Sequence, residues 1–175
     1  MDPDALLRQH RKRLLASPTD RLEPLDWDRE RIKRILPHRE PFLLLDRLTG
    51  VAFEEGLIAG SRTVPADDPV FAGHFPGSPV YPGCLEVEMI GQLGLCLHYF
   101  LESRSLEAPA EPRPLRVMAT RILGAHYLAP VLPGQELTLL ARKLEYDGFF
   151  ATMIGQVVAG GQVACVAIGE VCFPD

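Results

Sequence analysis

The sequence predicts an α+β fold in which a curved antiparallel sheet of about six strands wraps round one long central helix. The helix is indicated by the stretch Cys84–Leu101, which follows Pro82-Gly83 and is apolar nearly all round. The sheet is indicated by alternating segments in the last third of the chain, separated by the hairpin signals Asp147-Gly148 and Gly160-Gly161. A helix that is apolar on every side must be enclosed, and a curved sheet is what this chain offers for that purpose.

The first 30 residues are predicted to form an N-terminal extension to a main domain of residues 31–175. Asp4–Leu15 patterns as a short amphipathic helix with a basic face, and Ser17–Trp27, which contains two prolines, is typical of a linker. The basic face suits an acidic partner, although charged helix faces are more often simply solvated. A second short helix is expected over Asp28–Leu36, with Pro37 as its stop.

The main domain is expected to supply all the strands. Apolar or alternating runs predict strands over the following segments: Phe42–Val51, Gly56–Val64, Leu115–Leu123, Gln135–Tyr146, Phe149–Ala159 and Gln162–Phe173. Glu102–Pro114 is polar and contains three prolines, so it is expected to cross the surface between the helix and the last strands.

Composition excludes several classes of protein. The chain has 175 residues, of which 47% are hydrophobic and 23% charged, as expected for one globular domain. The net charge of -5 argues against a nucleic-acid partner. No signal-peptide pattern opens the chain, and Glu86, Glu88, Gln92 and His98 interrupt the apolar stretch, so we expect a cytoplasmic protein without a membrane partner.

The four cysteines show no C-x-x-C pair and lie in apolar runs. They are Cys84, Cys96, Cys165 and Cys172. We expect buried thiols in a reducing compartment rather than a disulfide framework. A nucleophilic role for Cys84 is conceivable, but without an adjacent base it is better explained as a small core residue.

The stretch Gly73–Gln92 contains the residues best suited to chemistry. His74 lies on a loop braced by glycines and prolines, and its ordinary pKa suits a general base. The backbone N–H of Gly83, at the helix start, could hold a carbonyl oxygen that becomes negative. Glu88 lies within the first two helical turns, where burial would raise its pKa and let it act as an acid.

The spacing of the polar residues on the helix separates their roles. Gln92 lies at i+4 from Glu88, within hydrogen-bond reach, whereas Glu86 points about 200° away and forms no carboxylate dyad with Glu88. A base, an acid and an N–H donor suit elimination of water from a β-hydroxy thioester, and no metal is expected. Simpler explanations are a turn histidine, an interface or capping glutamate, and a His38 that merely ends the preceding helix.

Two stretches carry a family resemblance. Leu36–Arg47 (LPHREPFLLLDR) and Gly73–Gln92 (GHFPGSPVYPGCLEVEMIGQ) resemble the signatures of the β-hydroxyacyl-acyl-carrier-protein dehydratases of type II fatty acid and polyketide synthesis, and Pro130–Gly134 resembles a weaker third motif. The match runs in order over roughly Ile32–Phe173. The resemblance implies the hotdog fold, a curved antiparallel sheet wrapped round one long helix.

The resemblance also implies roles for particular residues. The family's catalytic histidine corresponds to His74 and its acid to Glu88, and the N–H that polarises the thioester corresponds to Gly83. Gln92 orders the acid, and Phe75 supports the site. In the family the histidine and the acid come from different protomers, so we expect a homodimer or a trimer of dimers.

The resemblance implies no cofactor, because the substrate arrives on the phosphopantetheine arm of an acyl-carrier protein. Carrier proteins are acidic, so basic residues are candidates for docking them. These candidates are Arg39, Arg113, Arg116, Arg121 and the basic N-terminal helix.

Departures from the family pattern suggest a specialised member. Glu88 resembles the branch that only dehydrates, although Gly83-Cys84-Leu85 resembles the branch that also isomerises, and we favour dehydration alone. Tyr81 adjoins the expected acyl tunnel and could change its length. The basic residues of the housekeeping enzyme are missing around Leu123–Ala129. The alternatives are a hotdog thioesterase, or a non-catalytic subunit that binds carrier protein.

Overall fold

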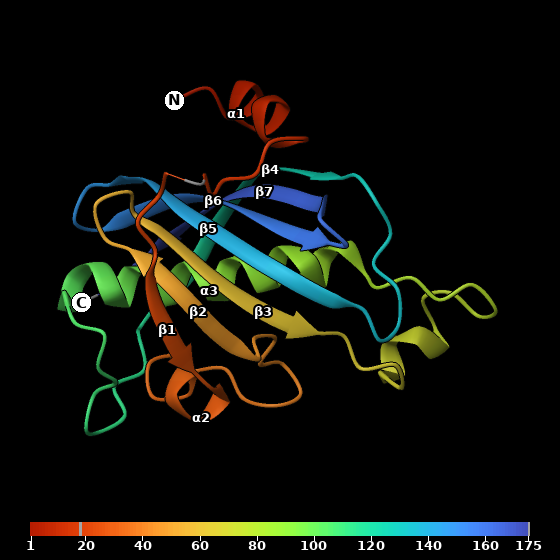
Figure 1. Ribbon diagram of the computed structural model, residues 1–175, viewed down its shortest axis with the longest axis horizontal. Helices are drawn as coiled ribbons and strands as arrows, with labels where there is room; N and C mark the ends of the chain where they lie inside the picture. Colours follow the sequence, from red (N-terminus) through yellow and green to blue (C-terminus); the bar gives the residue numbers. More distant parts are fainter. Residues whose placement is uncertain (18, 175) are drawn as a thin grey trace.

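The computed structural model describes residues 1–17 and 19–174 and consists of one sheet wrapped round one long helix (Figure 1). The sheet has seven strands in the order β1-β2-β3-β5-β6-β7-β4, and all neighbours are antiparallel. Their bounds are Glu23–Trp27 (β1), Arg47–Ala52 (β2), Leu57–Thr63 (β3), Met118–Tyr127 (β4), Glu136–Tyr146 (β5), Phe150–Ala159 (β6) and Gln162–Cys172 (β7). The predicted hotdog architecture is therefore confirmed.

The central helix α3, Gly83–Ser103, forms as predicted. Pro82 precedes its first residue, and Arg104 ends it in the left-handed conformation (φ 50°). Gly155 of β6 lets the helix approach the sheet closely, because a Cβ atom there would lie 2.4 Å from Cγ2 of Ile90. By length and composition α3 could span a membrane, but in this fold it is the core helix, against which the sheet packs.

The sheet has one strand more than predicted. Glu23–Trp27, expected to lie in a linker, pairs with β2 as the edge strand β1. Pro24 argued against a strand at this position in the sequence, but proline is tolerated on an edge strand. Conversely, Phe42–Leu45 was predicted to begin a strand but does not form one. Strand β2 begins only at Arg47, and the residues before it form an irregular segment.

The other element bounds differ modestly from expectation. The first helix α1, Pro3–His10, stops before Leu15, and the second helix α2, Arg29–Ile32, is a single turn instead of the expected Asp28–Leu36. The strand predicted over Leu115–Leu123 is β4, which starts later and continues to Tyr127. A short 3-10 helix, η1, Pro69–Ala72, precedes the loop with His74.

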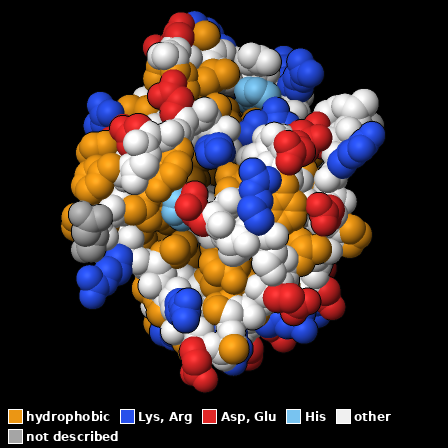
Figure 2. Space-filling view, turned by 90° about the vertical axis from the view of Figure 1, so that its left-hand side faces the viewer, with side chains coloured by type: hydrophobic (Ala, Val, Ile, Leu, Met, Phe, Trp, Pro, Cys, Tyr) orange, Lys and Arg blue, Asp and Glu red, His pale blue; other side chains and the backbone are white. Residues whose placement is uncertain are grey.

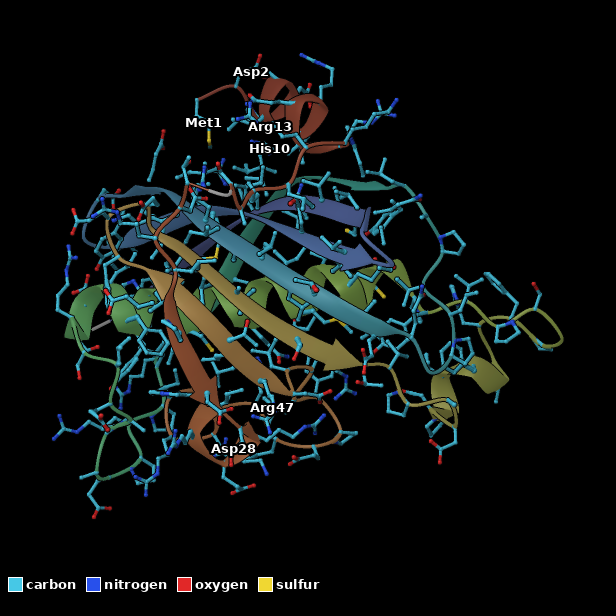
Figure 3. All side chains as sticks on the ribbon, in the orientation of Figure 1. Met1, Asp2, His10, Arg13, Asp28 and Arg47 are labelled. Atoms are coloured by element: carbon cyan, nitrogen blue, oxygen red, sulfur yellow. The ribbon has the colours of Figure 1, made fainter. Side chains whose placement is uncertain are left out.

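The N-terminal extension covers the face of the sheet opposite α3 (Figures 1 and 3). Leu7 and Leu15 are buried there. Fully buried Gln156 of β6 accepts a hydrogen bond from the Leu15 N–H (2.8 Å) and donates to the carbonyl oxygens of His10 (2.7 Å) and Arg13 (2.9 Å). The extension is therefore packed against the body of the protein, while the boundary predicted at residue 30 remains a prediction.

Candidate active site

The loop between η1 and α3 fixes the orientation of the His74 ring. His74 Nδ1 lies 2.8 Å from the carbonyl oxygen of Val80, and the Val80 N–H donates back to the His74 carbonyl at 3.0 Å. A carbonyl oxygen can only accept, so Nδ1 carries the proton. In the tautomer with the proton on Nδ1, the lone pair of Nε2 is free, as a general base requires.

The start of α3 and the end of β4 line an open cavity of about 570 Å³ beside His74. Its wall includes Gly83, Glu86 and Tyr127. Pro82 gives α3 no side-chain cap, so the N–H groups of the first turn are not occupied by a capping side chain. A Cβ atom on Gly83 would lie 2.4 Å from Cε1 of Tyr127, so a larger residue there would displace the tyrosine ring.

Glu86 is the buried acid of α3, with 3% of its surface exposed. Burial raises its pKa to about 8, and its Oε2 atom has no hydrogen-bond partner among the described residues. Burial and a raised pKa were predicted for Glu88 instead, and that prediction is wrong for the single chain. The helical phase predicted the two acids to face apart but did not indicate which side meets the sheet.

Glu88 lies on the other side of α3 with a third of its side chain (32%) exposed. Its Oε1 atom accepts a hydrogen bond from Gln92 Nε2 at 2.9 Å, as the i+4 spacing predicted, and lies 3.4 Å from His38 Nε2. Desolvation alone would raise the pKa of Glu88, but the hydrogen bonds from His38 and Gln92 outweigh it and lower that pKa.

Gln92 ties Glu88 to the segment that precedes β2. Only 1% of Gln92 is exposed, and its Nε2 also donates to the carbonyl oxygen of Phe42 at 2.8 Å. Its Oε1 accepts from the N–H of Leu44 at 2.8 Å. We call His38, Glu88 and Gln92 the Glu88 cluster. The side chain of Gln92 thus connects α3 to the first signature stretch, Leu36–Arg47.

The predicted site residues therefore divide into two groups within one chain. His74, Tyr81 and Gly83 line the cavity, and among the described residues that line it the one acid is Glu86. Glu88 and Gln92 belong to the cluster on the other side of α3. Phe75 stacks on His74 with 4.1 Å between ring centroids but is 54% exposed.

Cys84 also lines the cavity and is exposed, so its predicted place in the core is wrong. The residue directly follows Gly83 at the open start of α3, which leaves its side chain uncovered in the single chain. The other three cysteines are buried as free thiols, as predicted.

The arginines predicted to dock a carrier protein occupy different settings. Arg121 forms a bidentate ion pair with Glu170. Arg39 donates hydrogen bonds to the carbonyl oxygens of Leu36 and His38. Arg113 and Arg116 are exposed on the crossing 104–117, at the opposite end of α3 from the His74 loop (Figure 1). The face at that end mixes acidic and basic side chains rather than presenting one sign of charge (Figure 2).

Sequence reasoning missed three residues of the site. His38 was expected to end a helix, and Glu86 was set aside because it points away from Glu88. Tyr127 lies in the segment Leu123–Ala129, which was described only as lacking the family's basic residues. The 200° separation of the two acids around the helix was the one sequence signal for Glu86, because it predicted that Glu86 lies on a different side of the helix from Glu88. The contacts of His38 and Tyr127 with α3 are long-range and have no local signature.

Comparisons with known proteins point to one family. The family model described as a FabA-like domain matches residues 36–167. The 3-hydroxyacyl-acyl-carrier-protein dehydratase FabZ of Campylobacter jejuni is 36% identical over 136 residues, which cover 78% of this chain and 90% of the relative. The FabZ of Anaeromyxobacter is 36% identical over 141 residues, covering 80% and 85%.

A solved structure supports the fold independently. The dehydratase heterocomplex ApeI:P from Xenorhabdus doucetiae superimposes with a TM-score of 0.62 at 19% identity, covering 82% of this chain and 91% of that one. At this identity the likeness concerns the fold alone.

Proposed function

This chain belongs to the FabA-like domain family, and we propose that it removes water from β-hydroxyacyl thioesters carried on acyl-carrier protein, as a dehydratase of fatty acid or related acyl-chain synthesis. The observation that carries the proposal is the cavity that places a correctly protonated histidine, His74, beside the open N-terminus of a long helix. This pairing of a base with backbone N–H donors suits removal of a proton next to a thioester carbonyl.

The reaction begins at the α-carbon of the substrate. Nε2 of His74 takes the α-proton, and the N–H of Gly83 stabilises the negative charge that develops on the thioester oxygen. One donor of this kind is typically worth about 3–4 kcal/mol of the barrier. The departing β-hydroxyl must receive a proton, which leaves a trans-2-enoyl thioester and water.

We assign delivery of that proton to Glu88 of a second copy of the chain. Within one chain Glu88 does not line the His74 cavity, so a site that uses both residues needs two protomers. A partner that covers the exposed third of Glu88 would remove water from it and raise its pKa, which favours the protonated form that an acid needs. His38 and Gln92 position the carboxyl group.

Strand β4 offers a surface for such a homodimer. It is an edge strand of the sheet, and its side chains Met118, Ile122 and Tyr127 are more than half exposed. Edge strands with exposed apolar side chains are suited to pairing with another chain. Because Tyr127 also lines the His74 cavity, pairing at this edge would bring a second copy to the mouth of the site. A trimer of such dimers remains a prediction.

Acyl-carrier protein is the proposed partner, with phosphopantetheine as the arm that enters the cavity. The docking surface is proposed from charge complementarity alone, since carrier proteins are acidic and the candidate residues are basic. Arg121, already paired with Glu170, is the weakest of the predicted docking residues. The exposed basic residues of the N-terminal extension remain candidates: Arg8, Arg11, Lys12 and Arg13.

Mass spectrometry of a β-hydroxyacyl carrier protein incubated with the purified protein tests the proposed function. A loss of about 18 mass units from the acyl arm, abolished by His74→Ala, is the expected result. Loss of the whole acyl group would instead show a thioesterase. An unchanged acyl arm on a carrier that still binds would contradict the proposal and favour a non-catalytic binding subunit.

A further inference from the structure

Two buried polar side chains in the wall of the His74 cavity have no partner. Tyr81 and Glu86 expose only 1% and 3% of their surface, and Tyr81 Oη and Glu86 Oε2 form no hydrogen bond within the described residues. Both residues line the cavity together with His74 and Gly83. Each residue therefore carries an unused hydrogen-bonding atom, and each contributes to the wall of the same cavity.

Leaving such groups unpaired is unfavourable. A buried donor or acceptor without a partner typically costs about 1–3 kcal/mol, and folded proteins contain few of them. Neither atom is hydrogen-bonded to the polar lining residues His74, Cys84 and Tyr127. The rest of the wall is largely apolar and includes Val80, Pro82, Leu128, Ala129 and Pro130. Two unpaired groups in one cavity therefore indicate that a polar ligand group is to be received there.

The protonation states define the chemistry of that group. Burial raises the pKa of Glu86 to about 8 and the pKa of Tyr81 to about 12, so both side chains are neutral at pH 7. A neutral carboxyl and a phenol each carry one O–H donor and also accept. They match a neutral hydroxyl or carbonyl oxygen, whereas an ammonium group would require Glu86 to ionise in a buried position.

The position of Glu86 along α3 suits an oxygen beyond the reacting carbons. Glu86 lies three residues after Gly83 on the same side of the helix, about 4.5 Å further along its axis. The Gly83 N–H is the proposed site of the thioester carbonyl. With the acyl chain proposed to run from Gly83 along α3, an oxygen that meets Glu86 belongs to a later carbon than the one that loses water.

We propose that Tyr81 and Glu86 form a polar subsite that selects β-hydroxyacyl thioesters bearing a second oxygen, such as a hydroxyl on the δ-carbon, over all-carbon chains of equal length. This inference rests on the proposed dehydratase function and deepens it by naming the substrate class. Neither residue is assigned a part in the proton transfers.

A competition between two thioesters tests the subsite. Equimolar 3-hydroxyhexanoyl and 3,5-dihydroxyhexanoyl carrier proteins are mixed with the protein, and the ratio of their kcat/KM values is measured by mass spectrometry. We expect the dihydroxy substrate to be favoured about tenfold or more, since a site built to hydrogen-bond a hydroxyl rejects the analogue that lacks it. A ratio is insensitive to the fraction of protein that is folded.

Variants of the two residues provide the controls. Glu86→Leu and Tyr81→Phe should each bring the ratio toward one, while Glu86→Gln, which keeps a donor and an acceptor, should retain most of the preference. A wild-type ratio of one, or a ratio that neither variant changes, would overturn the proposal. An equal loss on both substrates in Glu86→Leu would also overturn it, because Glu86 would then act on the shared β-hydroxyl.

A binding measurement separates this proposal from the proposed function. Amide analogues of the two substrates, in which nitrogen replaces the thioester sulfur, are titrated into the protein by calorimetry. Should neither thioester lose water, the proposed dehydration fails. Tighter binding of the dihydroxy amide, lost in Glu86→Leu, would still support the subsite, and equal affinities would contradict it.

Discussion

On α3, the side that carries Glu86 and the side that carries Glu88 face different surroundings although the residues are two positions apart. The Glu86 side meets the His74 cavity, where the carboxyl is buried and its Oε2 atom has no partner among the described residues. Burial raises the pKa of this carboxyl to about 8. The Glu88 side meets the segment before β2, where His38 and Gln92 bind the carboxyl and lower its pKa. One helix thus presents a neutral acid on one side and a carboxylate favoured in its ionised form on the other.

Under the proposed mechanism, the two sides of α3 serve one site through two copies of the chain. The Glu86 side carries the proposed base and the proposed N–H donor, and the Glu88 side carries the proposed acid. Neither side is complete by itself. The two sides become one site only if a second protomer brings its Glu88 cluster to the first protomer's cavity.

Removing the base should have the largest effect. His74→Ala eliminates the proposed base, and we expect kcat/KM to fall by about 10²–10⁴-fold. Dehydration of a β-hydroxyacyl carrier protein, followed by mass spectrometry, measures it. Ser78→Ala, in the same loop and exposed, serves as the control and should retain activity. Comparable rates for the two variants would remove His74 from the mechanism.

The pH dependence of stability should distinguish the two acids. Since burial raises the pKa of Glu86, the folded protein keeps a proton that the unfolded chain loses between pH 4.5 and about 8. The free energy of unfolding therefore falls as pH rises through this window, by several kcal/mol at about 1.4 kcal/mol per pKa unit.

Urea unfolding of the wild type and Glu86→Gln at several pH values checks this. The substitution removes the titrating group, so the difference in stability between the two proteins should change across the window in favour of Glu86→Gln at higher pH. A difference that is constant with pH would show that Glu86 is not protonated in the folded state.

The two buried glutamines provide a matched test of the Glu88 cluster. Gln92→Leu leaves the Phe42 carbonyl and the Leu44 N–H without a partner, and we expect a loss of about 1–3 kcal/mol in unfolding free energy. Gln156→Leu should cost a similar amount on the opposite face of the sheet. Only Gln92→Leu should also lower kcat, because Glu88 loses a hydrogen-bond donor. Equal kcat values in the two folded variants would contradict a positioning role for Gln92.

The smallest effect is expected at His38. The His38 ring helps to lower the pKa of Glu88, so His38→Phe should raise that pKa and extend the basic limb of the pH–rate profile to higher pH. His98→Phe, which changes a histidine that stacks on Phe173, is the control and should leave the profile in place. A basic limb that does not move in His38→Phe would separate His38 from the acid.

The sequence predicted the fold well where signals are local. The apolar helix, both hairpins and the segments before them are correct, because helical periodicity and Gly-containing turns act over a few residues. Strand β1 was missed because five residues with a proline carry little strand signal. It exists because its backbone pairs with β2, which is a long-range contact.

The site was predicted in part for the same reason. The position of Gln92 relative to Glu88 follows from helical spacing alone, and the structure confirms the contact. Which of the two acids is buried depends on the side from which the sheet covers α3, and no local pattern contains that information. The roles of His74, Gly83 and Glu88 remain predictions that the experiments above address.

The most direct test of the central claim is complementation between inactive chains. Chains carrying His74→Ala and Glu88→Gln are unfolded together and refolded, and dehydration is measured against each variant alone. A site shared across a two-fold dimer leaves one intact site in each mixed dimer, so about a quarter of wild-type activity should return. Mixed dimers that form, as shown by mass spectrometry of the intact assembly, but remain inactive would contradict a site built from two protomers.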